Sequence, residues 1–119
     1  MVEIVKLNEE IEKDTFIYKL KYESYFDENL FLELLIGILQ QGCSNCSSEE
    51  KKQFVSIVFN FYAYITVCII SHFRKNDLFV IKNYTDDIIS YSDIFRDIIK
   101  HIIEDDIDKL KEYINQITE

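Results

Sequence analysis

The fold is decided by residues 54–73, FVSIVFNFYAYITVCIISHF, a run of twenty residues without a single Asp, Glu, Lys or Arg. Basic side chains flank this run at both ends: Lys51, Lys52, Arg74 and Lys75. The length suits either a membrane-spanning helix or the central helix of a soluble core. Polar residues recur in and beside the run at helical spacing: Gln53, Ser56, Asn60, Tyr64 and Ser71. Because Asn60 at mid-span would be costly in lipid, we predict a buried helix at the centre of a soluble bundle and no membrane association.

The N-terminal residues have the pattern of two short strands, 2–7 and 15–22. In the second, Phe16, Tyr18, Leu20 and Tyr22 alternate with other side chains at the period of a half-buried strand. The acidic segment 8–14 would connect the two, although it contains no tight-turn dipeptide. We therefore predict a short β-hairpin over residues 1–22, with a helical N-terminus as the alternative.

Residues 27–42 are predicted to form a helix because their apolar side chains recur on one helical face. These side chains are Leu30, Phe31, Leu34, Leu35, Ile38 and Leu39. Asp27 stands where an N-cap is expected and Gly42 where a C-cap glycine is expected. A small polar loop at residues 43–48 separates this helix from the next.

The sequence of the second half of the chain predicts further helices. Ser47 or Ser48 caps a helix that runs through the apolar stretch to about Arg74. From residue 85 to the end, apolar residues again follow a helical period, interrupted near residues 105–106. The expected fold is mostly α, or α+β if the hairpin forms. It is a single domain, 1–119, in which a three- to four-helix bundle occupies residues 27–119.

The amino-acid composition and the net charge exclude some classes of function. The chain has 119 residues, no proline and two glycines, which excludes Gly-rich phosphate-binding loops. Its net charge of −9 opposes direct binding of nucleic acid and favours a basic protein partner. Three cysteines, an odd number, argue against a disulfide framework. With no secretory signal pattern at the N-terminus, they indicate a reducing, cytoplasmic compartment.

Four residues have the types and spacing of a zinc site: Cys43, Cys46, Cys68 and His72. Three thiolates and one imidazole complete a tetrahedral set, and Cys68 and His72 share a helix face at i and i+4. However, Cys68 lies among apolar residues, where a free cysteine behaves as a small apolar side chain. We expect no metal and no cofactor, and zinc at these residues is the alternative.

Arg96 and His101 are separated by four residues. This spacing resembles the R-x4-H motif of HEPN-type ribonucleases, small helical proteins that are often toxins. The resemblance covers six residues and implies that Arg96 would bind the scissile phosphate while His101 transfers a proton, at a cleft between two subunits. Toxin members commonly have a tyrosine two positions after the histidine, where this chain has Ile103. The acidic surroundings would also repel RNA.

The C-terminal third is acidic and rich in tyrosine. Carboxylates and tyrosines there form a predicted partner-binding face: Asp93, Asp97, Glu104, Asp105, Asp108, Glu112, Tyr84, Tyr91 and Tyr113. Carboxylates on a rigid helix can occupy the basic groove of a nuclease and speed association, and tyrosines are frequent interface anchors. A solvated helix face with interspersed lysines is the alternative.

Together these patterns predict a small, acidic, non-enzymatic protein that binds and inhibits a protein partner. Immunity proteins, antitoxins and phage or viral inhibitors of host factors have this size and charge. One alternative is a ribonuclease toxin that uses Arg96 and His101, which would act as a homodimer. Another is a viral regulator that resembles a Bcl-2-like bundle built around a central apolar helix.

Overall fold

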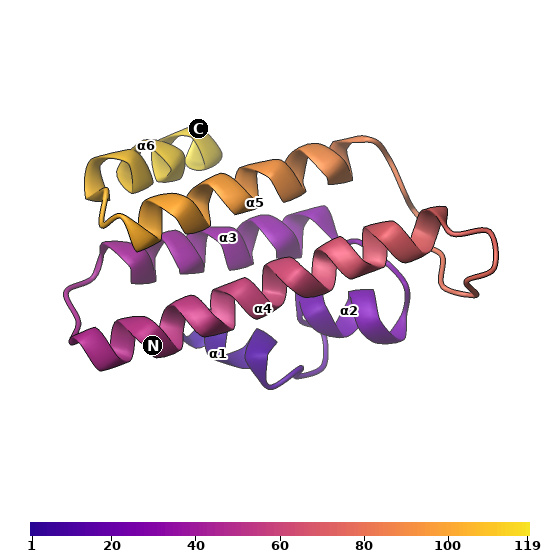
Figure 1. The fold of residues 1–119 in the computed structure, drawn as a ribbon, viewed down its shortest axis with the longest axis horizontal. Helices are drawn as coiled ribbons and strands as arrows, with labels where there is room; N and C mark the ends of the chain where they lie inside the picture. The colour runs from indigo at the N-terminus through magenta and orange to yellow at the C-terminus, as the bar shows by residue number, and fades with distance from the viewer.

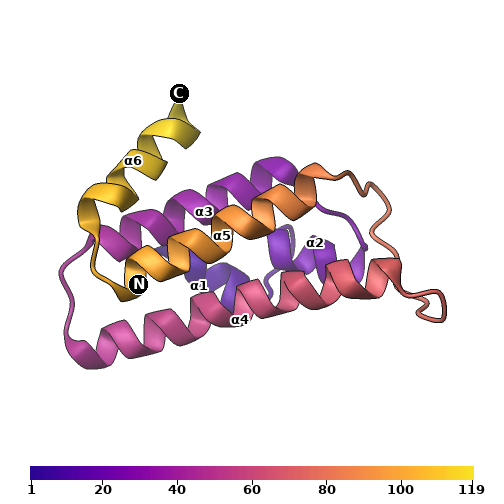
Figure 2. The ribbon, with the colours of Figure 1, turned by 45° about the horizontal axis from the view of Figure 1, so that its top comes forward.

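In the computed structural model, which describes residues 1–119, the chain folds into six α-helices and no strand. The helices are α1 (Glu3–Glu9), α2 (Phe16–Tyr22), α3 (Glu28–Cys43), α4 (Ser48–Phe73), α5 (Asp87–Ile103) and α6 (Ile107–Thr118). The long helices α3, α4 and α5 run lengthwise through an elongated bundle, and the short helices pack at its sides (Figures 1 and 2). The predicted helical bundle is confirmed.

The predicted N-terminal β-hairpin is wrong, because residues 1–22 form α1 and α2 instead. Thr15 caps α2, accepting a hydrogen bond at 3.3 Å from the Tyr18 N–H. The side chains that α2 buries are Phe16, Ile17 and Leu20, which is the i, i+1, i+4 spacing of a helix. The sequence seemed to alternate because Tyr18 and Tyr22 are aromatic like Phe16, although they lie outside the core. The two tyrosines are one helical turn apart, and their tilted rings contact each other.

Helix α3 occupies the centre of the bundle. It packs against α1, α2, α5 and α6, and it buries Phe31, Leu34, Leu35, Ile38 and Leu39. The prediction that residues 54–73 form the central buried helix is therefore wrong. The corresponding helix, α4, lies along one side and packs mainly on α5 (Figure 2).

Helix α4 is long and apolar enough to cross a membrane, and it is the only helix of the chain that is. In its most apolar window of 18 residues, 28% of the residues are buried. The buried stripe consists of Phe54, Val58, Phe61, Ile65 and Cys68. Other apolar side chains of α4 are exposed: Phe59, Val67, Ile70 and Phe73.

Capping side chains are found at the starts of α3 and α4, as the sequence predicted. Asp27 accepts from the Leu30 N–H at 3.0 Å, and Ser47 accepts from the Glu50 N–H at 3.2 Å. The predicted C-cap at Gly42 is wrong, because α3 continues through Cys43. Gly42 is instead a packing position, where Ile102 and Leu110 approach the helix closely.

The interruption predicted near residues 105–106 separates α5 from α6. Asp105 has a positive φ of 56°, and Asp106 caps α6 by accepting from the Lys109 N–H at 3.2 Å. A longer irregular segment, residues 74–86, joins α4 to α5. Asn83 holds this segment to the bundle, because its side-chain amide bonds both the N–H (2.9 Å) and the C=O (2.7 Å) of Phe26.

Candidate functional site

The four residues of the zinc alternative lie at two separate places. Cys43 ends α3 and Cys46 lies in the following loop, whereas Cys68 and His72 are near the other end of α4. The two pairs are about 30 Å apart along the helix axis. No group of three or more His, Cys, Asp or Glu side chains could hold a metal ion. Burial also raises the pKa of the Cys68 thiol to about 11, which favours the protonated form rather than the metal-binding thiolate.

Arg96 and His101 of the ribonuclease alternative point in different directions. Five residues of helix separate their side chains by about 140° around the axis of α5. Arg96 is exposed and pairs with Asp93 at 3.7 Å. The His101 side chain is 15% exposed and is enclosed between α5 and α6. Within one chain, the two residues therefore do not face a common cleft.

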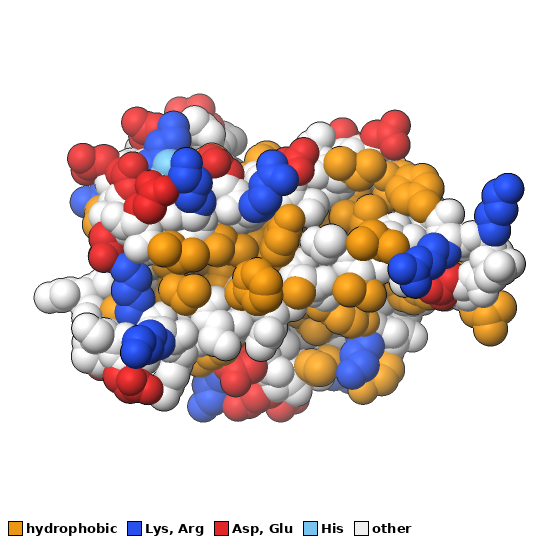
Figure 3. Space-filling view, in the orientation of Figure 1, with side chains coloured by type: hydrophobic (Ala, Val, Ile, Leu, Met, Phe, Trp, Pro, Cys, Tyr) orange, Lys and Arg blue, Asp and Glu red, His pale blue; other side chains and the backbone are white.

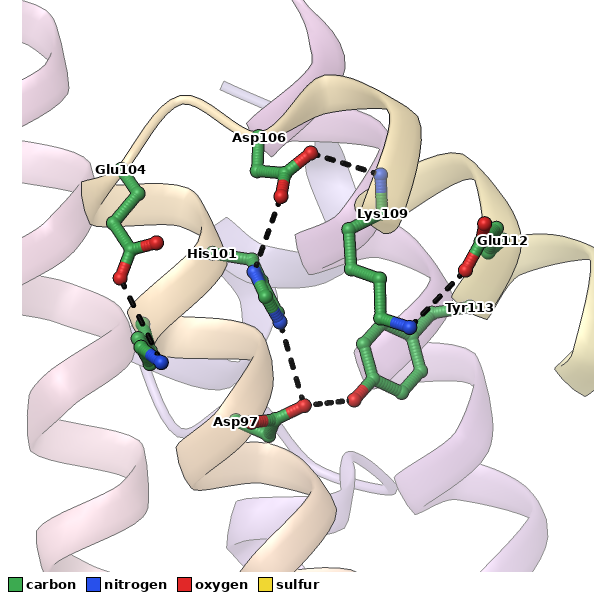
Figure 4. A network of polar contacts seen from close by, with 8 residues as sticks. Asp97, His101, Glu104, Asp106, Lys109, Glu112 and Tyr113 are labelled. Atoms are coloured by element: carbon green, nitrogen blue, oxygen red, sulfur yellow. Dashed lines mark hydrogen bonds and ion pairs between the residues drawn. The ribbon is translucent and has the colours of Figure 1, made fainter.

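His101 belongs to a network that joins α5 to α6 (Figure 4). Its Nε2 atom lies 3.5 Å from Asp97, and its Nδ1 atom lies 3.6 Å from Asp106. Neither contact has the geometry of a hydrogen bond, and the buried Nδ1 atom has no hydrogen-bond partner. The Tyr113 hydroxyl donates to Asp97 from the opposite side. Asp97 thus contacts two side chains on two helices.

The pKa values of this network follow from its geometry. The Tyr113 hydrogen bond, aided by the nearby His101, lowers the pKa of Asp97. Burial, together with the Asp97 carboxylate, raises the pKa of Tyr113 to about 12. Both shifts favour an ionised carboxylate and a neutral phenol at neutral pH. The hydrogen bond between Tyr113 of α6 and Asp97 of α5 therefore helps to hold the two helices together.

The other residues of the predicted partner-binding face are also mostly engaged within the chain. Ion pairs join Lys51 to Asp105 (2.6 Å), Lys109 to Glu112 (3.1 Å), Arg96 to Asp93 and Lys100 to Glu104 (3.9 Å). Tyr91 packs on Phe26 and Phe31 and donates to Glu28, and Tyr84 stacks on His72. Only Asp108 has no ion-pair partner.

Sequence reasoning missed a groove between α4 and α5. One hollow, of about 690 Å³, lies where the start of α4 meets the end of α5. Its apolar lining consists of Val55, Phe59, Ile99 and Ile103. A second hollow, of about 440 Å³, lies where the end of α4 meets the start of α5. It is lined by Tyr62, Ile69, Ile70, Phe73 and Ile89. We call the two hollows together the α4–α5 groove.

The two hollows of the groove follow one another along α4, and each has an apolar lining with polar residues beside it. Figure 3 shows a band of hydrophobic side chains over α4 and α5, with basic side chains at both ends. Phe59 is 55% exposed, and Ile70, Phe73 and Ile103 are exposed as well. These exposed apolar side chains lie next to one another and are rimmed by polar residues, which is a feature of interaction sites.

Charges at the groove differ in sign from those of the whole molecule. Lys51 and Lys52 line one end, and Arg74 lines the other. Lys51 is paired with Asp105, but Lys52 and Arg74 are exposed and make no ion pair. The free charges at the two ends are therefore positive on a chain with a net charge of −9.

One signal in the sequence could have revealed the groove. Beside the buried stripe of α4 runs a second stripe with the spacing i, i+4, i+7, i+11, i+14 and i+18: Val55, Phe59, Tyr62, Thr66, Ile69 and Phe73. A helix with two adjacent stripes needs packing partners on both. The remaining helices of this chain cover the first stripe and only part of the second, where Phe59 and Phe73 stay exposed. No family model, curated protein or solved structure matches the chain.

Proposed function

We propose that the protein is a non-enzymatic inhibitor that acts by binding another protein, and that the α4–α5 groove is its binding surface. The observation that carries this proposal is the exposed apolar lining of the groove, which extends along α4 (Figure 3). Burying such a surface against a partner is favourable, by about 25 cal/mol for each Å² of apolar area removed from water. Three free cysteines support a reducing, cytoplasmic compartment as the place of action.

The acidic surface has a supporting role in this proposal. A net charge of −9 attracts a basic protein over long range and speeds the encounter. Most carboxylates of the α5–α6 face are already paired with side chains of this chain. Contact with a new partner would therefore stabilise these paired carboxylates less than it would stabilise the exposed apolar groove.

A second candidate is the Bcl-2-like regulator, and the groove is the observation that favours it. Proteins of that kind hold an amphipathic helix in an apolar groove between helices. This candidate differs from an immunity protein or antitoxin in the target, and it uses the same kind of surface. The ribonuclease alternative gains no such support, because His101 is enclosed by carboxylates and Arg96 points away from it.

The test compares what three forms of the tagged protein recover from its native source after cross-linking. The forms are the wild type, Phe59→Glu with Ile70→Glu in the groove, and Val67→Glu as the matched control. Val67 is on the same helix and is 57% exposed, but it lines neither hollow. We expect one partner at near-equal amount with the wild type and the control, and at least a tenfold loss with the groove variant.

Two outcomes would contradict the proposal. Recovery of the protein alone, with no stoichiometric partner, would remove the binding role. A partner that is retained by the groove variant would place the binding surface elsewhere. In that case, charge reversal at Asp108 and Glu112 should slow association and flatten its salt dependence, which would assign binding to the acidic face.

A further inference from the structure

We infer that the α4–α5 groove accepts one amphipathic α-helix of the partner, with acidic residues near both ends of that helix. This inference rests on the proposed function, and it specifies the partner's chemistry. Three properties of the groove carry it: its length, its two apolar hollows and the sign of the free charges at its ends.

The length of the groove matches a helix. From Val55 to Phe73 the groove follows about 27 Å of the axis of α4, at about 1.5 Å per residue. A partner helix of about 18 residues would run the whole distance. Its apolar side chains, at the spacing i, i+4, i+7 and i+11, would enter the two hollows in succession. Such a helix would take the place of the packing partner that α4 lacks.

The ends of the groove select for acidic residues. Lys52 is unpaired at one end, and Arg74 is unpaired at the other. The adjacent Lys75 adds a second exposed positive charge beside Arg74. A carboxylate at each end of the bound helix would meet an unpaired cation. The middle of the groove offers no free charge, so the specificity comes from its two ends.

The same charges argue against a second copy of this chain as the occupant. In an antiparallel pairing of two α4 helices, Lys52 of one copy would lie near Arg74 of the other. In a parallel pairing, each basic end would face its own counterpart. Both arrangements place like charges together, which costs free energy.

A uniformly anionic membrane surface also matches the groove less well than a helix does. An anionic surface would repel a chain with a net charge of −9, and the carboxylates on the α5 side of the groove, Asp93 and Asp105, are paired with cations of this chain. Among the residues that line the groove, the unpaired cations lie only at its two ends. This separation suits a ligand with discrete charges at its own two ends.

The experiment uses a yeast-displayed library of 18-residue peptides and the full-length protein as bait. The apolar spacing i, i+4, i+7, i+11 is kept in the library, and two positions at each end are randomised. A second library has the same composition with the apolar positions scrambled. The baits are the wild type, Lys52→Glu with Arg74→Glu, Phe59→Glu with Ile70→Glu, and the control Val67→Glu.

We expect the wild type and Val67→Glu to enrich peptides of the first library with Asp or Glu at both ends. The charge-reversed bait should enrich Lys or Arg at those positions instead. For a selected peptide, reversing both ends should weaken binding to the wild type about three- to tenfold, as two exposed ion pairs would. The groove variant should enrich nothing from either library.

Other outcomes overturn the inference. No enrichment with the wild type, enrichment without a charge preference at the ends, or equal enrichment of the scrambled library would each do so. Sedimentation of the wild type as a dimer that Phe59→Glu dissociates would assign the groove to a second copy. Binding to phosphatidylglycerol vesicles that Phe59→Glu and Val67→Glu weaken equally would assign the whole exposed side of α4 to a membrane.

Failure of this inference differs from failure of the proposed function. If the cross-linked partner depends on the groove but the library shows no charge preference at the ends, only the acidic ends of the occupant are wrong. If cross-linking recovers no partner that depends on the groove, the proposed function itself is wrong, whatever the library shows.

Discussion

Gly37 of α3 lies so close to Ile4 of α1 that a methyl group at position 37 would overlap the Ile4 side chain. Helix α1 can pack on α3 only because residue 37 has no side chain. The two positions are far apart in the sequence, and nothing in the pattern of either segment indicates that they meet. This contact places the N-terminal helices on the central helix of the bundle.

Gly37→Ala should therefore destabilise the fold. The added methyl group gains about 1 kcal/mol of helix propensity, but overpacking costs about 1–3 kcal/mol, so we expect a net loss of up to about 2 kcal/mol. Gly42→Ala is the matched control. There the new methyl carbon would lie 3.1 Å from Ile102 Cγ1 and 3.2 Å from Leu110 Cδ1, side-chain atoms that can shift. Urea denaturation of both variants tests this, and equal stabilities would contradict it.

Asn8 connects the two N-terminal helices. Its side chain is buried, donates to the Ile4 C=O at 2.9 Å and accepts from the Ile17 N–H at 3.0 Å. Asn8→Ala leaves the Ile17 N–H without a partner, so we expect a loss of about 1–3 kcal/mol in the free energy of unfolding. The control is Asn29→Ala, at an exposed position of α3, with a change within about 0.5 kcal/mol. An Asn8→Ala variant with the same free energy of unfolding as the wild type would disprove this role.

The contact between Tyr113 and Asp97 predicts a pH dependence. The pKa of Asp97 is lowered from 3.8, chiefly by the Tyr113 hydroxyl. The carboxylate therefore stabilises the fold above pH 3.8 and loses this effect as the pH falls through its lowered folded-state value. Tyr113 has its pKa raised from 10.0 to about 12, chiefly by burial, so its contribution is complete below pH 10 and is lost as the pH rises through about 12.

Tyr113→Phe should accordingly lower stability by about 1 kcal/mol between pH 5 and pH 9, since the Asp97 side chain is partly exposed. The difference from the wild type should shrink below pH 3.8. Tyr25→Phe is the control, because Tyr25 is exposed and its hydroxyl makes no hydrogen bond within the chain. Urea denaturation at pH 3 and pH 7 measures both variants. A Tyr113→Phe difference that stays the same at the two pH values would contradict the assignment.

Local signals predicted the helices that have capping side chains, and tertiary contacts decided the rest. Asp27 and Ser47 each precede a segment with a helical apolar pattern, and both cap as expected. The strand pattern in residues 15–22 failed because eight residues are too few to separate period 2 from period 3.6 when five of them are aromatic or aliphatic. Helix α1 is held by Gly37 and Asn8, through contacts that no local pattern shows.

The place of α4 and the candidate site were harder to predict for a related reason. The length of an apolar run indicates how much apolar surface a helix has available for burial. It does not indicate whether other helices of the chain pack over that surface. In this fold α3 takes the centre, although its apolar run is shorter. The acidic face was recognisable as charge, but its internal pairing depends on α6 folding back over α5 (Figure 4).

His72 anchors the segment that sets the spacing of α4 and α5. Its Nδ1 atom accepts from the Ile81 N–H at 3.0 Å, and its ring stacks on Tyr84 at 4.3 Å. His72→Phe keeps a ring for the stack and removes the acceptor. Loss of a bond worth about 1 kcal/mol should speed hydrogen exchange at the Ile81 amide about fivefold. The Lys82 amide, which donates to the Ser24 C=O at 2.8 Å, should keep its rate. Faster exchange at both amides would show that the whole segment detaches, and no change at Ile81 would show that His72 does not hold it.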